Sequence, residues 1–238
     1  MNHQTMNFGC GCAACATEDV LPRRSFLAAG AAATLAGGML LGPLAARAQS
    51  TLTPDAALAK MMDGNARYVS TNLASFGADL DILRAKTVEK QEPFAAVLSC
   101  ADSRVPAEII FDQTIGHLFV TRVAGNVAST EMIASLEYGV AVLGTKVIMV
   151  LAHEACGAVK AAVAGGAVPG QISALYAPLR AAVDQGHGDY EVTARLNAKI
   201  QAGMLATASP VLADFIKKGE LKIVSAYYGL GSGKVTLL

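Results

Sequence analysis

The chain has 238 residues, of which 53% are hydrophobic and 16% are charged, and this composition can bury a sizeable core and excludes extended disorder. Lysine plus arginine equal aspartate plus glutamate at 19 each, and no long basic block occurs, which excludes the electrostatic footprint of a nucleic-acid-binding protein. The five cysteines, at positions 10, 12, 15, 100 and 156, are too few and too unevenly placed for a disulfide scaffold.

The first 48 residues have the pattern of a twin-arginine (Tat) export signal. The pair Arg23-Arg24 precedes an uncharged run rich in alanine, leucine and glycine, which ends in the small-residue pattern Ala46-Arg47-Ala48. An uncleaved membrane anchor is the alternative, because about 20 apolar residues can span a bilayer, but the glycines and the proline of the run favour removal. We expect export by the Tat machinery to the periplasm, cleavage after Ala48, and one domain over 49–238 with no stable membrane insertion.

The remaining chain alternates helical and strand patterns. Helical spacing or a helical turn is predicted, in chain order, over 54–70, 79–90, 106–111, 129–143, 172–183, 190–207 and 210–218. Apolar runs of strand length lie at 94–99, 117–122, 146–152, 221–228 and 234–238. The strand, helix, strand order predicts an α/β fold with a mostly parallel central sheet flanked by helices, and the last two strands predict a C-terminal hairpin or edge strand.

Residues able to carry chemistry concentrate in the segments 100–105 and 153–158, each directly after a predicted parallel strand. Ligands bind at this edge of open α/β sheets, because adjacent strand ends open a crevice there. Cys100 and Asp102 can point to one side, and His153 and Cys156 are three apart across a helix start. Two sulfurs, one imidazole and one carboxylate suit tetrahedral Zn²⁺ better than Mg²⁺ or Ca²⁺, with cobalt and iron as open alternatives.

A disulfide between Cys100 and Cys156 is the competing interpretation, because it is the default for two cysteines in an exported protein. The other three cysteines leave with the signal and receive no role. The resemblance to a twin-arginine signal implies export in the folded state, so that a metal can be loaded in the reducing cytoplasm first. His153 alone would more often be a structural histidine, but its fixed offset from Cys156 favours the metal site.

Three motifs, Cys100-x-Asp-Ser-Arg104, Arg122-Val-Ala-Gly-Asn126 and His153-x-x-Cys-Gly-Ala158, resemble those of the β-class carbonic anhydrases. The resemblance covers nearly the whole chain after the signal, from Gly64-Asn65 to Tyr227-Tyr228. It implies a hydro-lyase that interconverts carbon dioxide and bicarbonate. It further implies a homodimer or a tetramer, with the site near the subunit interface.

The resemblance also implies one Zn²⁺ per subunit on Cys100, His153 and Cys156, and a pair between Asp102 and Arg104. A fourth position can then hold water, whose pKa zinc lowers towards about 7 in the carbonic anhydrases with three histidine ligands, and the resulting hydroxide attacks carbon dioxide. Two thiolates weaken that effect, so a carboxylate is expected to accept a hydrogen bond from the zinc-bound hydroxide while the guanidinium holds it. Released from Arg104, Asp102 becomes a fourth metal ligand, which the resemblance implies is an inactive state favoured at lower pH.

Two further residues are candidates for binding substrate. Gln113 matches the position of a substrate-facing amide in the family, with a surface glutamine as a slightly weaker alternative. The backbone N–H of Gly157 opens a helix and can face an anion. His117 is interpreted as a strand-edge histidine with no role as a proton shuttle. The alternatives in function are hydrolysis of carbonyl sulfide or carbon disulfide on the same fold, and a non-catalytic zinc-binding or bicarbonate-sensing protein.

Overall fold

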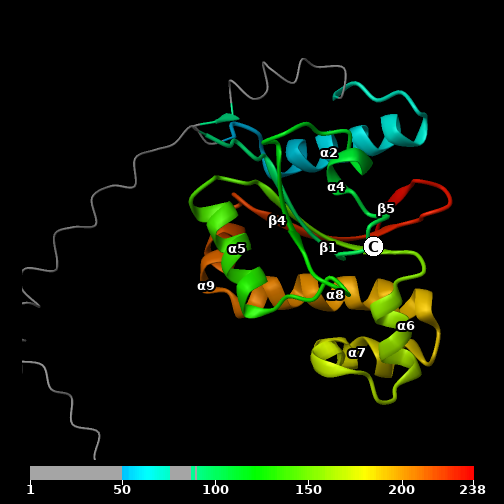
Figure 1. Ribbon diagram of the computed structural model, residues 1–238. Helices are drawn as coiled ribbons and strands as arrows, with labels where there is room; N and C mark the ends of the chain where they lie inside the picture. Colours follow the sequence, from blue (N-terminus) through cyan, green and yellow to red (C-terminus); the bar gives the residue numbers. More distant parts are fainter. Residues whose placement is uncertain (1–49, 76–86, 89) are drawn as a thin grey trace, which may run out of the picture. The chain divides into compact units, whose positions relative to one another are not determined.

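The structure is a computed structural model that describes residues 50–75, 87–88 and 90–238 (Figure 1). Within these residues the chain forms a five-stranded sheet in the order β2-β1-β3-β4-β5, in which only β5 is antiparallel to its neighbour. The strands are β1 (Ala95–Ser99), β2 (Leu118–Arg122), β3 (Val147–His153), β4 (Lys222–Tyr228) and β5 (Val235–Leu237). The predicted α/β fold with a mostly parallel sheet and a C-terminal hairpin is therefore confirmed.

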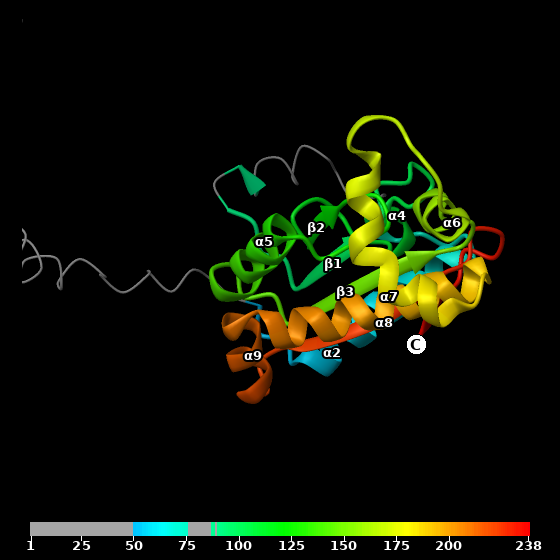
Figure 2. The same ribbon diagram turned by 90° about the horizontal axis from the view of Figure 1, so that it is seen from below.

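Helices cover both faces of the sheet, as the two views in Figures 1 and 2 show. On one face lie α2 (Pro54–Val69) and the short α4 (Ala107–Ile110). The other face carries α5 (Thr130–Ala141), α6 (Gly157–Ala164), α7 (Tyr176–Gly186), α8 (Tyr190–Ala208) and α9 (Pro210–Lys217). No helix in the described part of the chain is both long enough and apolar enough to cross a bilayer.

The neighbouring strands β1 and β3 are buried at every position, which explains why their sequences are continuous apolar runs rather than alternating ones. Successive side chains of β1 enter opposite cores: Ala96 and Leu98 pack on the side of α8, and Ala95 and Val97 on the side of α2. The sheet is thus the middle layer between two apolar cores, which keeps its strand ends in register.

One predicted helix is wrong in its outline. The segment 172–183 was expected as a single helix, but the chain forms the 3₁₀ helix η3 (Gly170–Leu175) and then starts α7 at Tyr176. Pro178 explains the break, because proline is tolerated only in the first turn of an α-helix and α7 must begin just before it. The predicted helix over 79–90 lies largely outside the described residues.

Candidate metal centre

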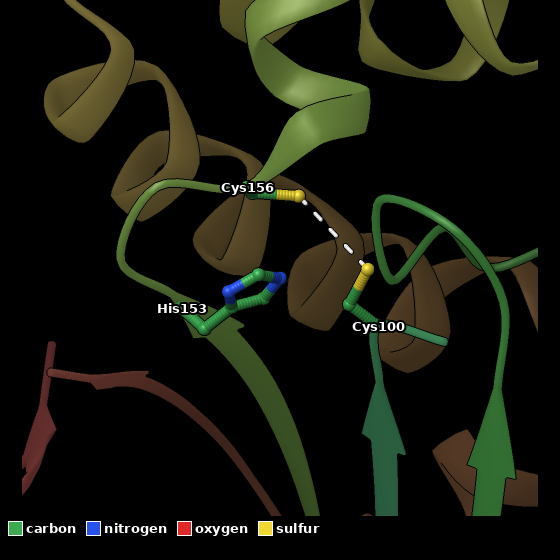
Figure 3. A group of neighbouring side chains, drawn as sticks. All are labelled: Cys100, His153 and Cys156. Atoms are coloured by element: carbon green, nitrogen blue, oxygen red, sulfur yellow. Dashed lines mark hydrogen bonds between the residues drawn. The ribbon is translucent and has the colours of Figure 1, made fainter. Parts of the chain in front are cut away.

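The three predicted ligands meet at the carboxyl edge of the sheet (Figure 3). Cys100 directly follows β1, and His153 is the last residue of the neighbouring parallel strand β3. Cys156 is the N-cap residue of α6, three positions further on. Parallel pairing of β1 with β3 brings together residues that are more than fifty positions apart in the chain.

The geometry of this cluster fits a tetrahedral metal ion. One ligand atom from each of Cys100, His153 and Cys156 lies within 4.8 Å of the others, and the three side chains are buried. The two sulfurs are free thiols 3.9 Å apart, close to the roughly 3.8 Å edge expected for tetrahedral zinc with thiolate bonds of about 2.3 Å. The cluster therefore favours the metal site over the disulfide.

The histidine of the cluster has one nitrogen left without a partner. Nδ1 of His153 lies 2.8 Å from the carbonyl oxygen of Glu154, and Nε2 is fully buried with no hydrogen-bond partner. A proton on Nδ1 that is donated to this carbonyl leaves a lone pair on Nε2, which is the form that binds a metal. An unsatisfied buried nitrogen beside two thiols is explained by a cation among them.

The two thiols share a hydrogen bond that changes the acidity of both. Donation from Cys156 lowers the pKa of Cys100 to about 4, and the amide of Gly125, which also donates to this sulfur, adds to the effect. The same bond to Cys100, together with burial, raises the pKa of Cys156 above its ordinary value. The pair therefore holds one negative charge readily, and a second thiolate requires a cation beside it.

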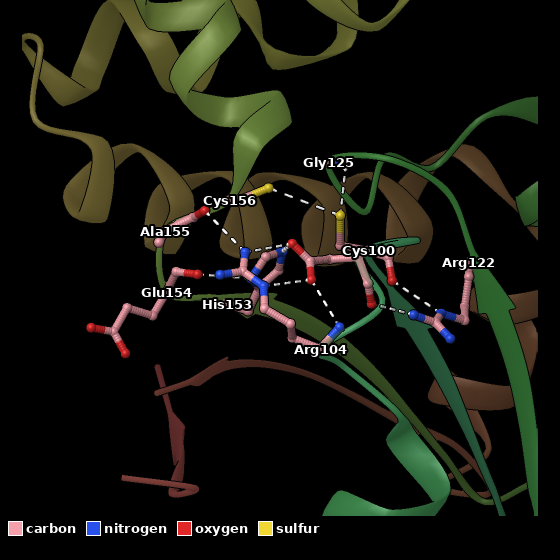
Figure 4. A network of polar contacts seen from close by, with 9 residues as sticks. Cys100, Arg104, Arg122, Gly125, His153, Glu154, Ala155 and Cys156 are labelled. Atoms are coloured by element: carbon pink, nitrogen blue, oxygen red, sulfur yellow. Dashed lines mark hydrogen bonds and ion pairs between the residues drawn. The ribbon is translucent and has the colours of Figure 1, made fainter. Parts of the chain in front are cut away.

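Asp102 and Arg104 form the predicted ion pair. Figure 4 shows Arg104 beside Cys100, His153 and Cys156. The guanidinium donates from Nε to Oδ1 at 2.9 Å and from Nη2 to Oδ2 at 2.7 Å, and the backbone N–H of Arg104 donates to Oδ1 at 2.9 Å. These bonds hold the pKa of Asp102 well below its usual range. Oδ2 lies 3.9 Å from Nε2 of His153, so the carboxylate faces the cluster while it remains paired.

Arg122 and Gly125, the second of which the sequence places in a tight turn that supports the site, hold the first ligand segment. Arg122 at the end of β2 donates from Nε to the carbonyl of Cys100 at 3.1 Å and from Nη2 to the carbonyl of Asp102 at 2.5 Å. Gly125 donates its N–H to the sulfur of Cys100 at 3.3 Å, as Figure 4 also shows. Both belong to the motif 122–126, whose presence was the only sequence signal for them.

The remaining candidates make none of the hydrogen bonds described above. Gln113 is buried in the α4 to β2 connection and donates its amide to the carbonyl of Phe111 at 2.9 Å. Gly157 begins α6 and is exposed, with open space where a side chain would be. Their contact with substrate, like the role of Asp102 as a fourth metal ligand, stays a prediction. His117 precedes β2 and so lies at the opposite edge of the sheet, away from the cluster.

Comparison with known proteins agrees with this geometry. A family model described as carbonic anhydrase matches residues 95–235. Carbonic anhydrase 2 of Mycobacterium tuberculosis is 35% identical over 192 residues, which cover 77% of this chain and 92% of the relative. A second relative, the carbonic anhydrase of Mycolicibacterium smegmatis, is 35% identical over 195 residues, which cover 77% of this chain and 93% of the relative.

Solved structures of β-carbonic anhydrases superpose on this chain. The β-carbonic anhydrase of Coccomyxa in complex with acetazolamide superposes with a TM-score of 0.60 at 28% identity, covering 67% of this chain and 81% of that one. A β-carbonic anhydrase of Aspergillus fumigatus superposes with a TM-score of 0.61 at 26% identity, covering 77% of this chain and 89% of that one. With its parallel sheet and its Cys-His-Cys cluster at the strand ends, the chain belongs to the β-carbonic anhydrase family.

Proposed function

We propose that this protein catalyses the reversible hydration of carbon dioxide to bicarbonate and a proton. The observation that carries the proposal is the arrangement of a buried Cys-His-Cys cluster beside an ionised carboxylate that is held by a guanidinium. The cluster accounts for a metal, and the ion pair accounts for a group that can orient a nucleophile next to it.

The three ligand residues and the ion pair would have different roles in the reaction. Cys100, His153 and Cys156 would hold Zn²⁺, which when bound lowers the pKa of a coordinated water and so supplies hydroxide near neutral pH. The carboxylate of Asp102 can accept a hydrogen bond from the attacking oxygen. This bond would orient a lone pair of that oxygen towards carbon dioxide. Arg104 engages both oxygens of this carboxylate, which keeps Asp102 charged and restrains it from turning into the cluster.

The decisive test is stopped-flow hydration of carbon dioxide by the zinc-quantified protein, from mildly acidic to alkaline pH. Turnover that scales with zinc content is the expected result. Zero turnover at every pH would contradict the proposal and favour a non-catalytic zinc-binding or bicarbonate-sensing protein. Parallel assays with carbonyl sulfide and carbon disulfide separate the hydrolase alternative, because a hydrolase would turn these substrates over and leave carbon dioxide nearly unchanged.

We further propose that residues 1–48 form a Tat signal and that the domain over 49–238 works in the periplasm. The arginine pair at 23 and 24, the uncharged run after it and the Ala-x-Ala ending support this assignment. Replacing both arginines with lysine should retain the protein in the cytoplasm in its full-length form. A mature N-terminus at residue 49 in periplasmic extracts of the wild type is expected, and unaltered export of the double variant would contradict the proposal.

A homodimer or tetramer is the assembly we propose. Large apolar side chains are exposed on and beside α2 and α4, namely Val69, Leu73 and Ile109. A second copy of the chain packed on this face would remove their apolar surface from water. Light scattering after gel filtration should give a mass of two or four chains, and a monomer at micromolar concentration would contradict this assembly.

A further inference from the structure

Two amide side chains lie fully buried on α8, on the face of that helix that packs towards the sheet. Asn197 and Gln201 are one turn apart and are 0% exposed. Nε2 of Gln201 donates to Oδ1 of Asn197 at 3.1 Å, so the two side chains form one unit. Burying two amides is costly unless each finds partners, and the position of those partners shows what the pair does.

The partners lie in the connection between β2 and α5. Nδ2 of Asn197 donates to the carbonyl of Gly125 at 2.8 Å, and Oε1 of Gln201 accepts from the N–H of Ala128 at 2.9 Å. Gln201 also donates from Nε2 to the carbonyl of Pro178 in α7 at 3.1 Å. The amide pair therefore ties the 123–128 connection to two helices.

This connection is the part of the chain that reaches the first metal ligand. Gly125 donates its own N–H to the sulfur of Cys100 at 3.3 Å. Gly125 and Asn126 are two consecutive left-handed residues, with φ of 78° and 44°. Glycine adopts this conformation freely, but at Asn126 it costs free energy, which contacts from the surrounding structure must offset. A Cβ at Gly125 would lie 3.3 Å from the side chain of Leu179, so the turn is also packed closely against α7.

We infer that Asn197 and Gln201 are positioning residues of the metal centre: from α8 they hold the Gly125 N–H against the sulfur of Cys100. The path consists of two hydrogen bonds, one from the Asn197 amide to the Gly125 carbonyl and one from the N–H of the same glycine to the sulfur. This role rests on the proposed function only in taking Cys100 as a zinc ligand.

A hydrogen bond to a ligating sulfur withdraws charge from it and restricts its position, and so adjusts both metal affinity and the acidity of the metal's other ligands. Without the Asn197 amide, the carbonyl of Gly125 is buried without its partner, and the glycine is free to turn its N–H away from Cys100. We expect zinc affinity to fall about 10-fold or more, in the range typical of lost outer-shell partners of metal sites.

The test compares Asn197→Leu and Gln201→Met with Asn65→Leu as a matched control. Asn65 is also a buried amide, on the other face of the sheet, where it forms hydrogen bonds with Ile110, Gly233 and Val235 and with none of the three ligand residues. Zinc affinity is measured by competition with a chromophoric chelator, and the Gly125 amide is followed by NMR in the protein loaded with ¹¹³Cd. Thermal stability is recorded for all three variants.

Both α8 variants should bind zinc about 10-fold or more weakly and shift the Gly125 amide proton, whereas Asn65→Leu should lower the melting temperature and leave both readouts as in the wild type. Equal zinc affinity and an unmoved Gly125 amide in the α8 variants would overturn the inference. If neither apolar variant folds, Gln201→Glu takes their place, because it keeps the acceptor for Ala128 and loses the donor to Asn197. None of these readouts needs carbon dioxide turnover, so an inactive but zinc-binding protein would refute the proposed function and leave this test intact.

Discussion

The two segments that carry the metal ligands are held in place by different means. His153 is the last residue of the seven-residue strand β3, which is buried along its whole length, and Cys156 is the N-cap residue of α6. Cys100 and Asp102 follow the five-residue strand β1 and continue into a loop that is held by Arg122, Arg104 and Gly125. The first arrangement relies on regular backbone structure, and the second relies on side chains and a turn brought from elsewhere.

The difference shows where each segment is vulnerable. Backbone pairing within a packed sheet distributes its stability over many residues, so the position of His153 depends little on any single side chain. The loop after Cys100 depends on a few charge-assisted hydrogen bonds, each of which can be removed by one substitution. Single substitutions should therefore affect the loop after Cys100 more than the segment after β3.

The largest effect should come from the ligands themselves, where the two segments are equally sensitive. His153→Ala removes one of three metal ligands, and we expect zinc affinity to fall by well over about 100-fold, more than the loss of an outer-shell partner costs, with activity lost in parallel. Metal content after dialysis checks this. His117→Ala is the control, because this histidine lies at the opposite sheet edge, and a comparable zinc loss in that variant would contradict the assigned site.

A smaller effect is expected at the ion pair of the loop. Arg104→Ala frees the carboxylate of Asp102 and should lower the rate of carbon dioxide hydration about 10-fold to 100-fold while zinc stays bound. The pair of Arg180 with Asp184 is an ordinary exposed ion pair within α7, so Arg180→Ala serves as the control and should keep full activity. Full activity in Arg104→Ala would remove the ion pair from the mechanism.

A substitution at Arg122 would show how far its side chain holds the loop after Cys100. Arg122→Gln loses the charge-assisted bonds to the carbonyls of Cys100 and Asp102, and we expect about 1 kcal/mol less stability and a modest loss of zinc affinity. Urea unfolding and chelator competition measure the two quantities. Unchanged values for both would show that β1 alone places the loop, contrary to the contrast drawn above.

The smallest expected effect is on how the stability of the fold changes with pH. The pKa of Asp102 is lowered in the folded protein by its bonds to Arg104, so the pair stabilises the fold above the unfolded value of about 3.9 and loses this contribution as the pH falls through the lower folded value. The urea midpoint of zinc-free wild type should exceed that of Arg104→Ala by a constant small amount between about pH 5 and 8. The two midpoints should converge below about pH 4, and a difference that grows in acid would show the opposite sign.

Much of the fold was predictable because its signals are local. The apolar runs at 94–99 and 146–152 mark strands buried on both faces, and Pro54 and Pro210 mark helix starts. The break before α7 was missed, although Pro178 is a local signal, because the apolar spacing continues across it. The ligand set was predictable because each half of it is a short motif at a strand end.

The support of the site was not predictable in the same way. Arg122 and Gly125 stand in a recognisable motif, yet nothing in the motif states that they bond to Cys100 and Asp102. Asn197 and Gln201 carry no signal at all, since two amides on a helix are more often solvated than buried. Their role appears only when α8 packs across the sheet.

The order of the elements, the ligand residues and the chemistry that they can support follow from the amino-acid sequence, because they depend on periodicity and on donor type over a few positions. The tertiary structure alone decided how the ligands are held. It placed Asp102 in its pair with Arg104, left Nε2 of His153 without a partner beside two thiols, and set α8 beneath the loop that reaches Cys100. The reason is physical: hydrogen bonds between residues distant in the chain exist only after the sheet and its helices have packed.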